Sequence, residues 1–257
     1  MHSHMKGIVT RVNHVPFMKT PHMTITAISD THGHLPLMQP SHIAIVCGDI
    51  FPGEMDHKPT LQGDWFKNNF LPWTETIDCE RVFLVAGNHD CWLERNNEKM
   101  RRQFALDSGG KLVYLYDTVV DYHGFKIYGT PWVPTPFRNR AFSAEEEALK
   151  EKYASIPCSL DLLITHTVPY DCNGIGISEI DSHLSGSKEL LNAIASRNIR
   201  CLIGGHIHMP KERFAHKDFS GNKTLLINSA CCDNHKRPLH QPITLAIPQS
   251  SNIPIIR

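Results

Sequence analysis

The chain has 257 residues with 26 basic and 26 acidic side chains, so its formal net charge is zero. A hydrophobic share of 41% and a charged share of 20% are typical of a folded protein and exclude a disordered one. The length suffices for one sizeable core, and the neutral charge argues against nucleic-acid binding through bulk electrostatics.

The sequence also indicates where the protein works. It contains no apolar stretch long enough to span a bilayer, and its first 22 residues lack the continuous apolar core of a secretory signal. The eight cysteines form no CxxC pair, which favours a reducing compartment. We therefore expect a cytoplasmic protein that does not bind membranes.

Taken in chain order, residues 1–22 show no periodicity and are interpreted as an N-terminal extension or leader, followed by a single domain over residues 23–257. Five short apolar runs within this domain are typical of buried strands, being too short to span a membrane and too continuous for half-exposed strands. These runs are TITAIS (24–29), IAIVC (43–47), RVFLVA (81–86), DLLIT (161–165) and RCLI (200–203).

Helices are predicted between the runs. One begins near Glu94 and covers the arginine-rich stretch to Leu106, a second starts with a capping box at Ser143 and ends near Ala154, and a third follows Gly186. Residues 111–131 are predicted to form short strands joined by tight turns, one of them at residues 122–124. This order favours an α/β fold in which two mixed sheets pack together with helices outside, over a single doubly wound sheet.

Polar side chains that can bind metal follow the five apolar runs. In open α/β folds the functional site lies at the ends of the strands, so we expect these side chains to meet in one dinuclear site. The candidate metal ligands are Asp30, His32, Asp49, Asn88, His166, His206 and His208.

The local sequence suggests how the candidate ligands after the first two apolar runs reach an ion. Asp30 and His32 are two residues apart after a strand, and in an extended backbone that spacing directs both side chains the same way. Asp49 follows Gly48, which permits a tight turn, and its carboxylate is the natural bridge between two ions. The mixture of carboxylate, amide and imidazole predicts two divalent ions, with Mn²⁺ preferred and Fe, Zn, Co or Ni as alternatives.

The charge balance points to a phosphate substrate. Two divalent ions, two aspartates and one bridging hydroxide leave about one positive charge, and such a pair of ions clamps a phosphoryl group while activating the hydroxide for in-line attack. His89 is predicted to contact the substrate and protonate the leaving group, with Asn88 as a second substrate contact. Asp90 is predicted to orient the His89 ring.

Together, the blocks SDTHGH, GD, GNHD, TH and GGHIH resemble the calcineurin-like metallophosphoesterase superfamily over most of the chain. The resemblance implies a four-layer αββα sandwich. It assigns one ion to the positions of Asp30, His32, Asp49 and His208, and the other to Asp49, Asn88, His166 and His206.

Finer features narrow the resemblance. IYGTPWVP, GSKELLNAI and LLINSACC resemble the metallophosphoesterase-domain (MPPED-like) proteins, relatives of the class III cyclic nucleotide phosphodiesterases. The chain has GDIFPG where the superfamily's protein phosphatases have GDxVDRG. The resemblance thus implies a phosphodiesterase for small phosphodiesters such as cyclic nucleotides, acting as a monomer or homodimer. The alternatives are a phosphomonoesterase or a catalytically weak scaffold, and a nuclease is disfavoured.

Overall fold

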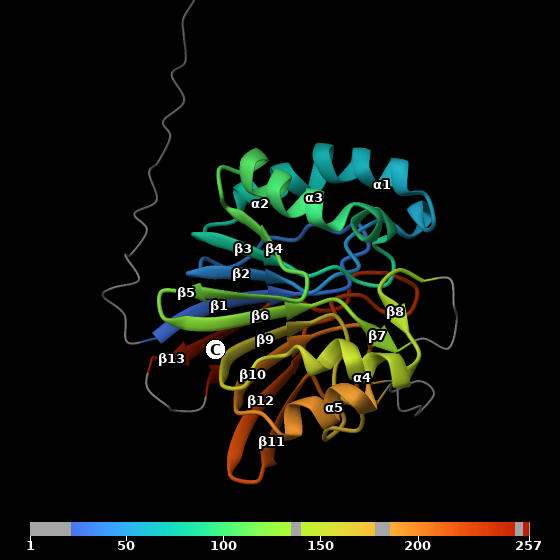
Figure 1. Cartoon of the computed structure of the whole chain (residues 1–257). Helices are drawn as coiled ribbons and strands as arrows, with labels where there is room; N and C mark the ends of the chain where they lie inside the picture. Colours follow the sequence, from blue (N-terminus) through green and yellow to red (C-terminus); the bar gives the residue numbers. More distant parts are fainter. Residues whose placement is uncertain (1–21, 135–139, 178–185, 250–253, 257) are drawn as a thin grey trace, which may run out of the picture.

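A computed structural model describes residues 22–134, 140–177, 186–249 and 254–256. Apart from His22, the predicted N-terminal extension lies outside the described residues. Figure 1 shows two sheets of strands lying between two groups of helices. Within the described ranges, no helix is both long and apolar enough to cross a membrane.

Each sheet contains six strands of mixed direction. The first has the order β14-β13-β1-β2-β3-β4, and the second β11-β12-β10-β9-β6-β5. The strands of the first sheet are β1 (His22–Ile28), β2 (Ile43–Val46), β3 (Arg81–Leu84), β4 (Leu112–Tyr114), β13 (Ile243–Pro248) and β14 (Ile255–Ile256). Those of the second are β5 (Thr118–Tyr122), β6 (Phe125–Thr130), β9 (Leu160–Thr165), β10 (Ile199–Gly204), β11 (Phe214–Phe219) and β12 (Asn222–Asn228). Two further short strands, β7 (Val133–Pro134) and β8 (Ser143–Ala144), pair with each other.

The five predicted strands are confirmed, and their unbroken apolar sequences have a simple cause. Because successive side chains of a strand point to opposite faces, a strand between two packed layers buries both. In β2, Ile43 and Ile45 enter the core between the sheets, whereas Ala44 and Val46 enter the core beneath the helices. No position of this strand is left for a polar residue.

Helices cover the outer face of each sheet (Figure 1). On the first sheet lie α1 (Pro59–Trp65), the π-helical turn η3 (Phe66–Phe70), α2 (Leu71–Thr76) and α3 (Cys91–Asp107). On the second lie α4 (Glu146–Ala154) and α5 (Lys188–Ala195). Phe66, Phe70 and Phe104 belong to the first outer core, and Leu149 and Leu190 to the second. The predicted sandwich of two sheets with outer helices is therefore confirmed.

Two helix starts differ from the prediction. Helix α3 begins at Cys91, three residues before the predicted start. The capping box predicted at Ser143 is wrong, because Ser143 lies in β8 and its hydroxyl donates to the Arg140 carbonyl. The carboxylate of Glu146 instead accepts the backbone N–H of Lys188 at 3.0 Å, and so caps the neighbouring helix α5.

Candidate metal centre

The candidate ligands lie at the carboxyl ends of strands in both sheets. Strands β1, β2 and β3 are parallel neighbours in the first sheet, and β9 and β10 are parallel neighbours in the second. Parallel strands end at the same edge of a sheet, so the residues that follow them gather there. The two edges meet directly: the backbone N–H of His206, after β10, donates to Asp30 Oδ2, after β1, at 2.8 Å.

One group of donor atoms is formed by Asp30, His32 and His208, whose ligand atoms lie within 4.8 Å of one another. The Nε2 atoms of the two imidazoles face each other at 3.3 Å, and His208 Nε2 is 3.3 Å from Asp30 Oδ1. Asp30 Oδ1 is buried without a hydrogen-bond partner in the described part of the chain. Two imidazole nitrogens and a carboxylate oxygen this close together form a set of donor atoms that a cation between them would satisfy.

A second group surrounds Asp49. His166 Nε2 lies 3.4 Å from Asp49 Oδ2 and 3.0 Å from Asn88 Oδ1, and the His166 and His206 rings are 5.1 Å apart. The ligand atoms of Asp30, Asp49 and His166 also lie within 4.8 Å of one another. Asp30 is thus the carboxylate common to both groups of donor atoms, whereas the bridging role of Asp49 remains a prediction.

Backbone carbonyls hold two of the imidazoles in one orientation. His166 Nδ1 lies 2.6 Å from the Cys47 carbonyl oxygen, and His208 Nδ1 lies 2.8 Å from the Asp233 carbonyl oxygen. A proton on each Nδ1 therefore leaves Nε2 to face the other donor atoms. Such outer partners are the usual means of fixing the ring of a metal-binding histidine.

The extended backbone predicted for Asp30 and His32 is wrong, although the two side chains do converge. Their φ angles are 55° and 44°, and Asp49 has a φ of 54°. These values lie in the left-handed region, which costs about 1 kcal/mol for a non-glycine residue. The chain turns sharply where each strand ends, and this turn directs the carboxylates into the centre.

Glycine at position 87 is required by close packing. A Cβ atom at Gly87 would lie 2.6 Å from the backbone nitrogen of Asp49 and 2.7 Å from Cε1 of His166, and would contact Asp49 Oδ1. These distances are shorter than any real Cβ contact. The AGNHD block therefore brings its backbone against two candidate ligands, and only glycine fits there.

Burial and neighbouring charges divide the four imidazoles into two pairs. Burial lowers the pKa of His32 and of His206 to about 4. Burial opposes protonation of His166 and His208 as well, but the Asp49 carboxylate raises the pKa of His166 to about 10 and the Asp30 carboxylate raises that of His208 to about 9. In the metal-free protein, two imidazolium groups thus balance the carboxylates of Asp30 and Asp49.

His89 lies beside the centre, as predicted, with its Nε2 3.9 Å from Asp49 Oδ2. The orienting role predicted for Asp90 is wrong. The Asp90 carboxylate instead accepts the backbone N–H groups of Gly87, Asp49 and Ile50 at 2.7, 2.9 and 3.0 Å. His89 Nδ1 contacts Asp56 Oδ1 at 2.7 Å.

The difference between Asp56 and Asp90 has a geometric cause. Asp90 is adjacent to His89 in the sequence, but its side chain turns back and ties the loop after β3 to the loop after β2. Asp56 is 33 residues away in sequence and reaches His89 from the loop that precedes α1. No local signal distinguishes Asp56 from other acidic loop residues, which is why sequence reasoning missed it.

The residues fit a pair of divalent ions. All seven predicted ligands lie at this one edge, and their donor set of two carboxylates, one amide and four imidazoles suits ions such as Mn²⁺, Fe²⁺ and Zn²⁺. Asp30 Oδ1 is buried without a hydrogen-bond partner in the described part of the chain, which leaves it free to bind a cation.

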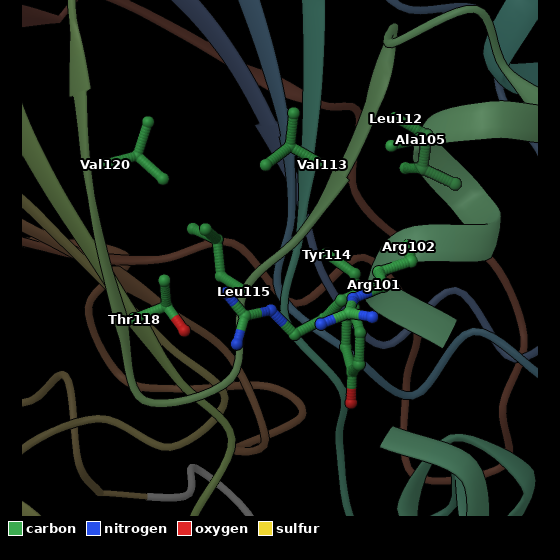
Figure 2. A pocket seen from close by; sticks show the side chains of 9 residues that line it. All are labelled: Arg101, Arg102, Ala105, Leu112, Val113, Tyr114, Leu115, Thr118 and Val120. Carbon is green, nitrogen blue, oxygen red and sulfur yellow. The ribbon is translucent and has the colours of Figure 1, made fainter. Parts of the chain in front are cut away.

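A separate cavity of about 460 Å³ lies at the outer edge of the sheets, between α3, β4 and β5 (Figure 2). Its lining combines aliphatic side chains, such as Val113 and Val120, with Arg101 and Arg102. It contains no carboxylate or imidazole and none of the candidate ligands. This cavity is thus not the metal centre.

Comparison with known proteins agrees with the geometry. Residues 23–210 match the family model described as calcineurin-like phosphoesterase. The UPF0046 protein C25E10.12 of Caenorhabditis elegans is 31% identical over 181 residues, a match that covers 64% of this chain and 61% of the relative. Metallophosphoesterase domain-containing protein 1 of Homo sapiens is 27% identical over 254 residues, covering 88% of this chain and 71% of the relative.

Two of the C. elegans relatives, C25E10.12 and T07D4.2, are matched over 61% of their own length. A solved structure aligns with a TM-score of 0.59 at 14% identity, covering 92% of this chain and 98% of that chain. At this low identity the structural likeness shows the fold alone.

Proposed function

Because the chain belongs to the calcineurin-like phosphoesterase family, we propose that it is a metal-dependent phosphodiesterase that hydrolyses small phosphodiesters, with cyclic nucleotides as the candidate substrates. The observation that carries this proposal is the complete donor set. Two carboxylates, an amide and four imidazoles meet at one edge, and two of the imidazoles are oriented by backbone carbonyls.

We propose that two divalent ions, Mn²⁺ in the first instance, bind to this edge. One would be held by Asp30, His32, Asp49 and His208, and the other by Asp49, Asn88, His166 and His206. When bound, such ions neutralise phosphoryl oxygens and lower the pKa of a shared water. The protein would hold the ions through side chains that are shielded from bulk solvent. Asp30 and His166 are fully buried, and Asp49 is 2% exposed, so bulk water does not compete for their donor atoms.

His89 is the proposed proton donor to the leaving oxygen. Its Nε2 faces the centre near Asp49, while Nδ1 is held by Asp56 at 2.7 Å. A carboxylate at Nδ1 fixes the ring orientation, so that Nε2 is directed toward the substrate. Asn88, with its amide oxygen on His166, remains a proposed ligand and substrate contact.

The diesterase assignment is supported by what the centre lacks and by the relatives it resembles. The segment GDIFPG does not supply the arginine with which the superfamily's protein phosphatases grip a phosphate, which argues against a protein phosphatase. The complete ligand set also argues against a scaffold without activity. The eight cysteines are all free, which is consistent with the proposed reducing, cytoplasmic location.

The test is steady-state hydrolysis by metal-stripped protein refilled with Mn²⁺. Bis(p-nitrophenyl) phosphate and p-nitrophenyl phosphate form the first pair of substrates, followed by 2′,3′-cAMP and 3′,5′-cAMP. Metal-dependent diester cleavage that exceeds monoester cleavage supports the proposal. Preference for the monoester makes the protein a phosphatase, and no turnover with both ions bound favours the scaffold.

A further inference from the structure

A group of charged side chains outside the seven ligands lies against the outer side of His89. Arg140 Nη1 is 3.0 Å from Asp56 Oδ2 and 3.1 Å from His89 Nδ1. Lys236 Nζ is 3.5 Å from the same oxygen of Asp56. The side chains of Asp56, Arg140 and Lys236, which are distant in sequence, thus meet at one point beside the metal centre.

This group carries a surplus of positive charge. Among the described residues, Arg140 and Lys236 both contact Asp56 Oδ2 while His89 contacts Oδ1, so these two cations and one carboxylate carry a net charge of about +1. The neighbouring Arg237 differs, because Asp233 holds it at 2.7 Å. The side chains of Arg140 and Lys236 are 35% and 31% exposed, so both remain accessible to a ligand.

The backbone of each cation is fixed in place. The Lys236 carbonyl oxygen lies 3.1 Å from His34 Nε2, and the Arg140 carbonyl accepts the hydroxyl of Ser143 at 2.6 Å. Gly53 makes room for the lysine side chain, since a Cβ there would stand 2.8 Å from both Cδ and Nζ of Lys236. Both charges are therefore presented from anchored segments.

Their position relative to His89 indicates what they would bind. His89 Nε2 faces Asp49 and the metal centre, whereas Nδ1 faces Arg140. The cations thus lie across the His89 ring from the metal centre. A substrate whose leaving portion extends from the centre past His89 would bring an anionic group on that portion against them.

We propose that Arg140 and Lys236 form an anion-binding subsite for a second phosphate on the leaving portion of the substrate, an inference that rests on the proposed phosphodiesterase function. The preferred substrate class is then a phosphodiester that carries an additional phosphate. A guanidinium beside an ammonium group is a common pairing for phosphate, because the first binds two oxygens and the second adds a point charge.

The test compares two substrates that differ only by this phosphate, 2′,3′-cAMP and its 5′-phosphorylated form, on Mn²⁺-loaded protein. Since hydrogen bonds to charged groups contribute enough to change an equilibrium constant about tenfold, we expect kcat/KM to be about tenfold or more higher for the 5′-phosphorylated substrate. Arg140→Gln and Lys236→Met should each bring this ratio close to one. Arg101→Gln, which removes an arginine on α3, should leave the ratio unchanged.

Two further measurements separate the subsite from a general loss of activity. Gly53→Ala keeps the charge of Lys236 but displaces its side chain, and should reduce the substrate ratio less than Lys236→Met does. Calorimetric titration of the metal-free protein with inorganic pyrophosphate should show binding that the double variant Arg140→Gln/Lys236→Met weakens about tenfold and Arg101→Gln does not.

Failure of the subsite and failure of the proposed phosphodiesterase function would give different results. Equal hydrolysis of both cyclic nucleotides by the wild-type protein would overturn the subsite and leave the phosphodiesterase proposal intact. Absence of turnover on every diester would overturn the phosphodiesterase proposal, and with it the substrate class. Pyrophosphate binding that is insensitive to Arg140→Gln/Lys236→Met would overturn the subsite itself.

Discussion

Metal loading should release protons from two particular histidines. In the metal-free protein the pKa is about 10 for His166 and about 9 for His208, so both are protonated at pH 7. His32 and His206, with pKa values of about 4, are already neutral. Because a ligand imidazole must lose its Nε2 proton, binding of two ions at pH 7 should release at least two protons.

The sign and size of the pH effect follow directly. Protonation competes with the cations below the raised pKa values, so affinity should increase with pH and level off above about pH 10. With two protons exchanged, the overall binding constant should fall about 100-fold per pH unit between pH 8 and 6, or about 2.7 kcal/mol.

Isothermal titration with Mn²⁺ in buffers of different ionisation enthalpy measures the protons released. His166→Gln and His208→Gln should each lower the count by one. His123→Gln, which replaces an exposed histidine in the hairpin between β5 and β6, should leave it unchanged. Release of less than one proton at pH 7 with both ions bound would show that the two imidazoles are neutral in the metal-free protein, and would refute the reasoning.

Three other predictions concern the construction of the centre. Asn88→Ala and His208→Ala each remove a proposed ligand and should lower metal-dependent diester turnover by about 100-fold or more without changing the circular dichroism spectrum. Near-normal turnover in both variants would contradict the ligand assignment. Gly87→Ala places a methyl group within 2.7 Å of two ligand residues, so its metal content by atomic absorption should fall, whereas Gly53→Ala, which meets a flexible lysine, should keep its metal. Asp90→Ala leaves three buried backbone amides unpaired and should lower the free energy of unfolding by about 3 kcal/mol or more in urea titrations; a loss below about 1 kcal/mol would show that these amides find other partners.

The helices over the first sheet show one limit of sequence reasoning. The stretch from Pro59 to Thr76 folds into α1, η3 and α2, and none of these was predicted. Prolines stand in the first turns of α1 and α2, and the stretch lacks a long run of apolar residues at helical spacing. Packing of Phe66 and Phe70 against the sheet decides this structure, since short helices depend on tertiary contacts for most of their stability.

By itself, the sequence determined which residues form the buried strands and which donors follow them. A strand between two layers is mostly apolar, so the polar residues after it mark the edge of the sheet, and the seven candidate ligands were chosen from that pattern. The chemistry of the donors, carboxylate with imidazole, was likewise readable without a structure.

Only the tertiary structure decided what surrounds the ligands. Asp56, and not the predicted Asp90, contacts the His89 ring. The Asp90 side chain is directed toward the backbone of Gly87, and Asp56 reaches His89 from a loop 33 residues away. The carbonyls that orient His166 and His208, and the approach of Arg140 to His89, are set by loop paths that have no periodic signature. Strands are specified by local pattern, whereas the groups that tune a site are brought together by the packing of distant loops.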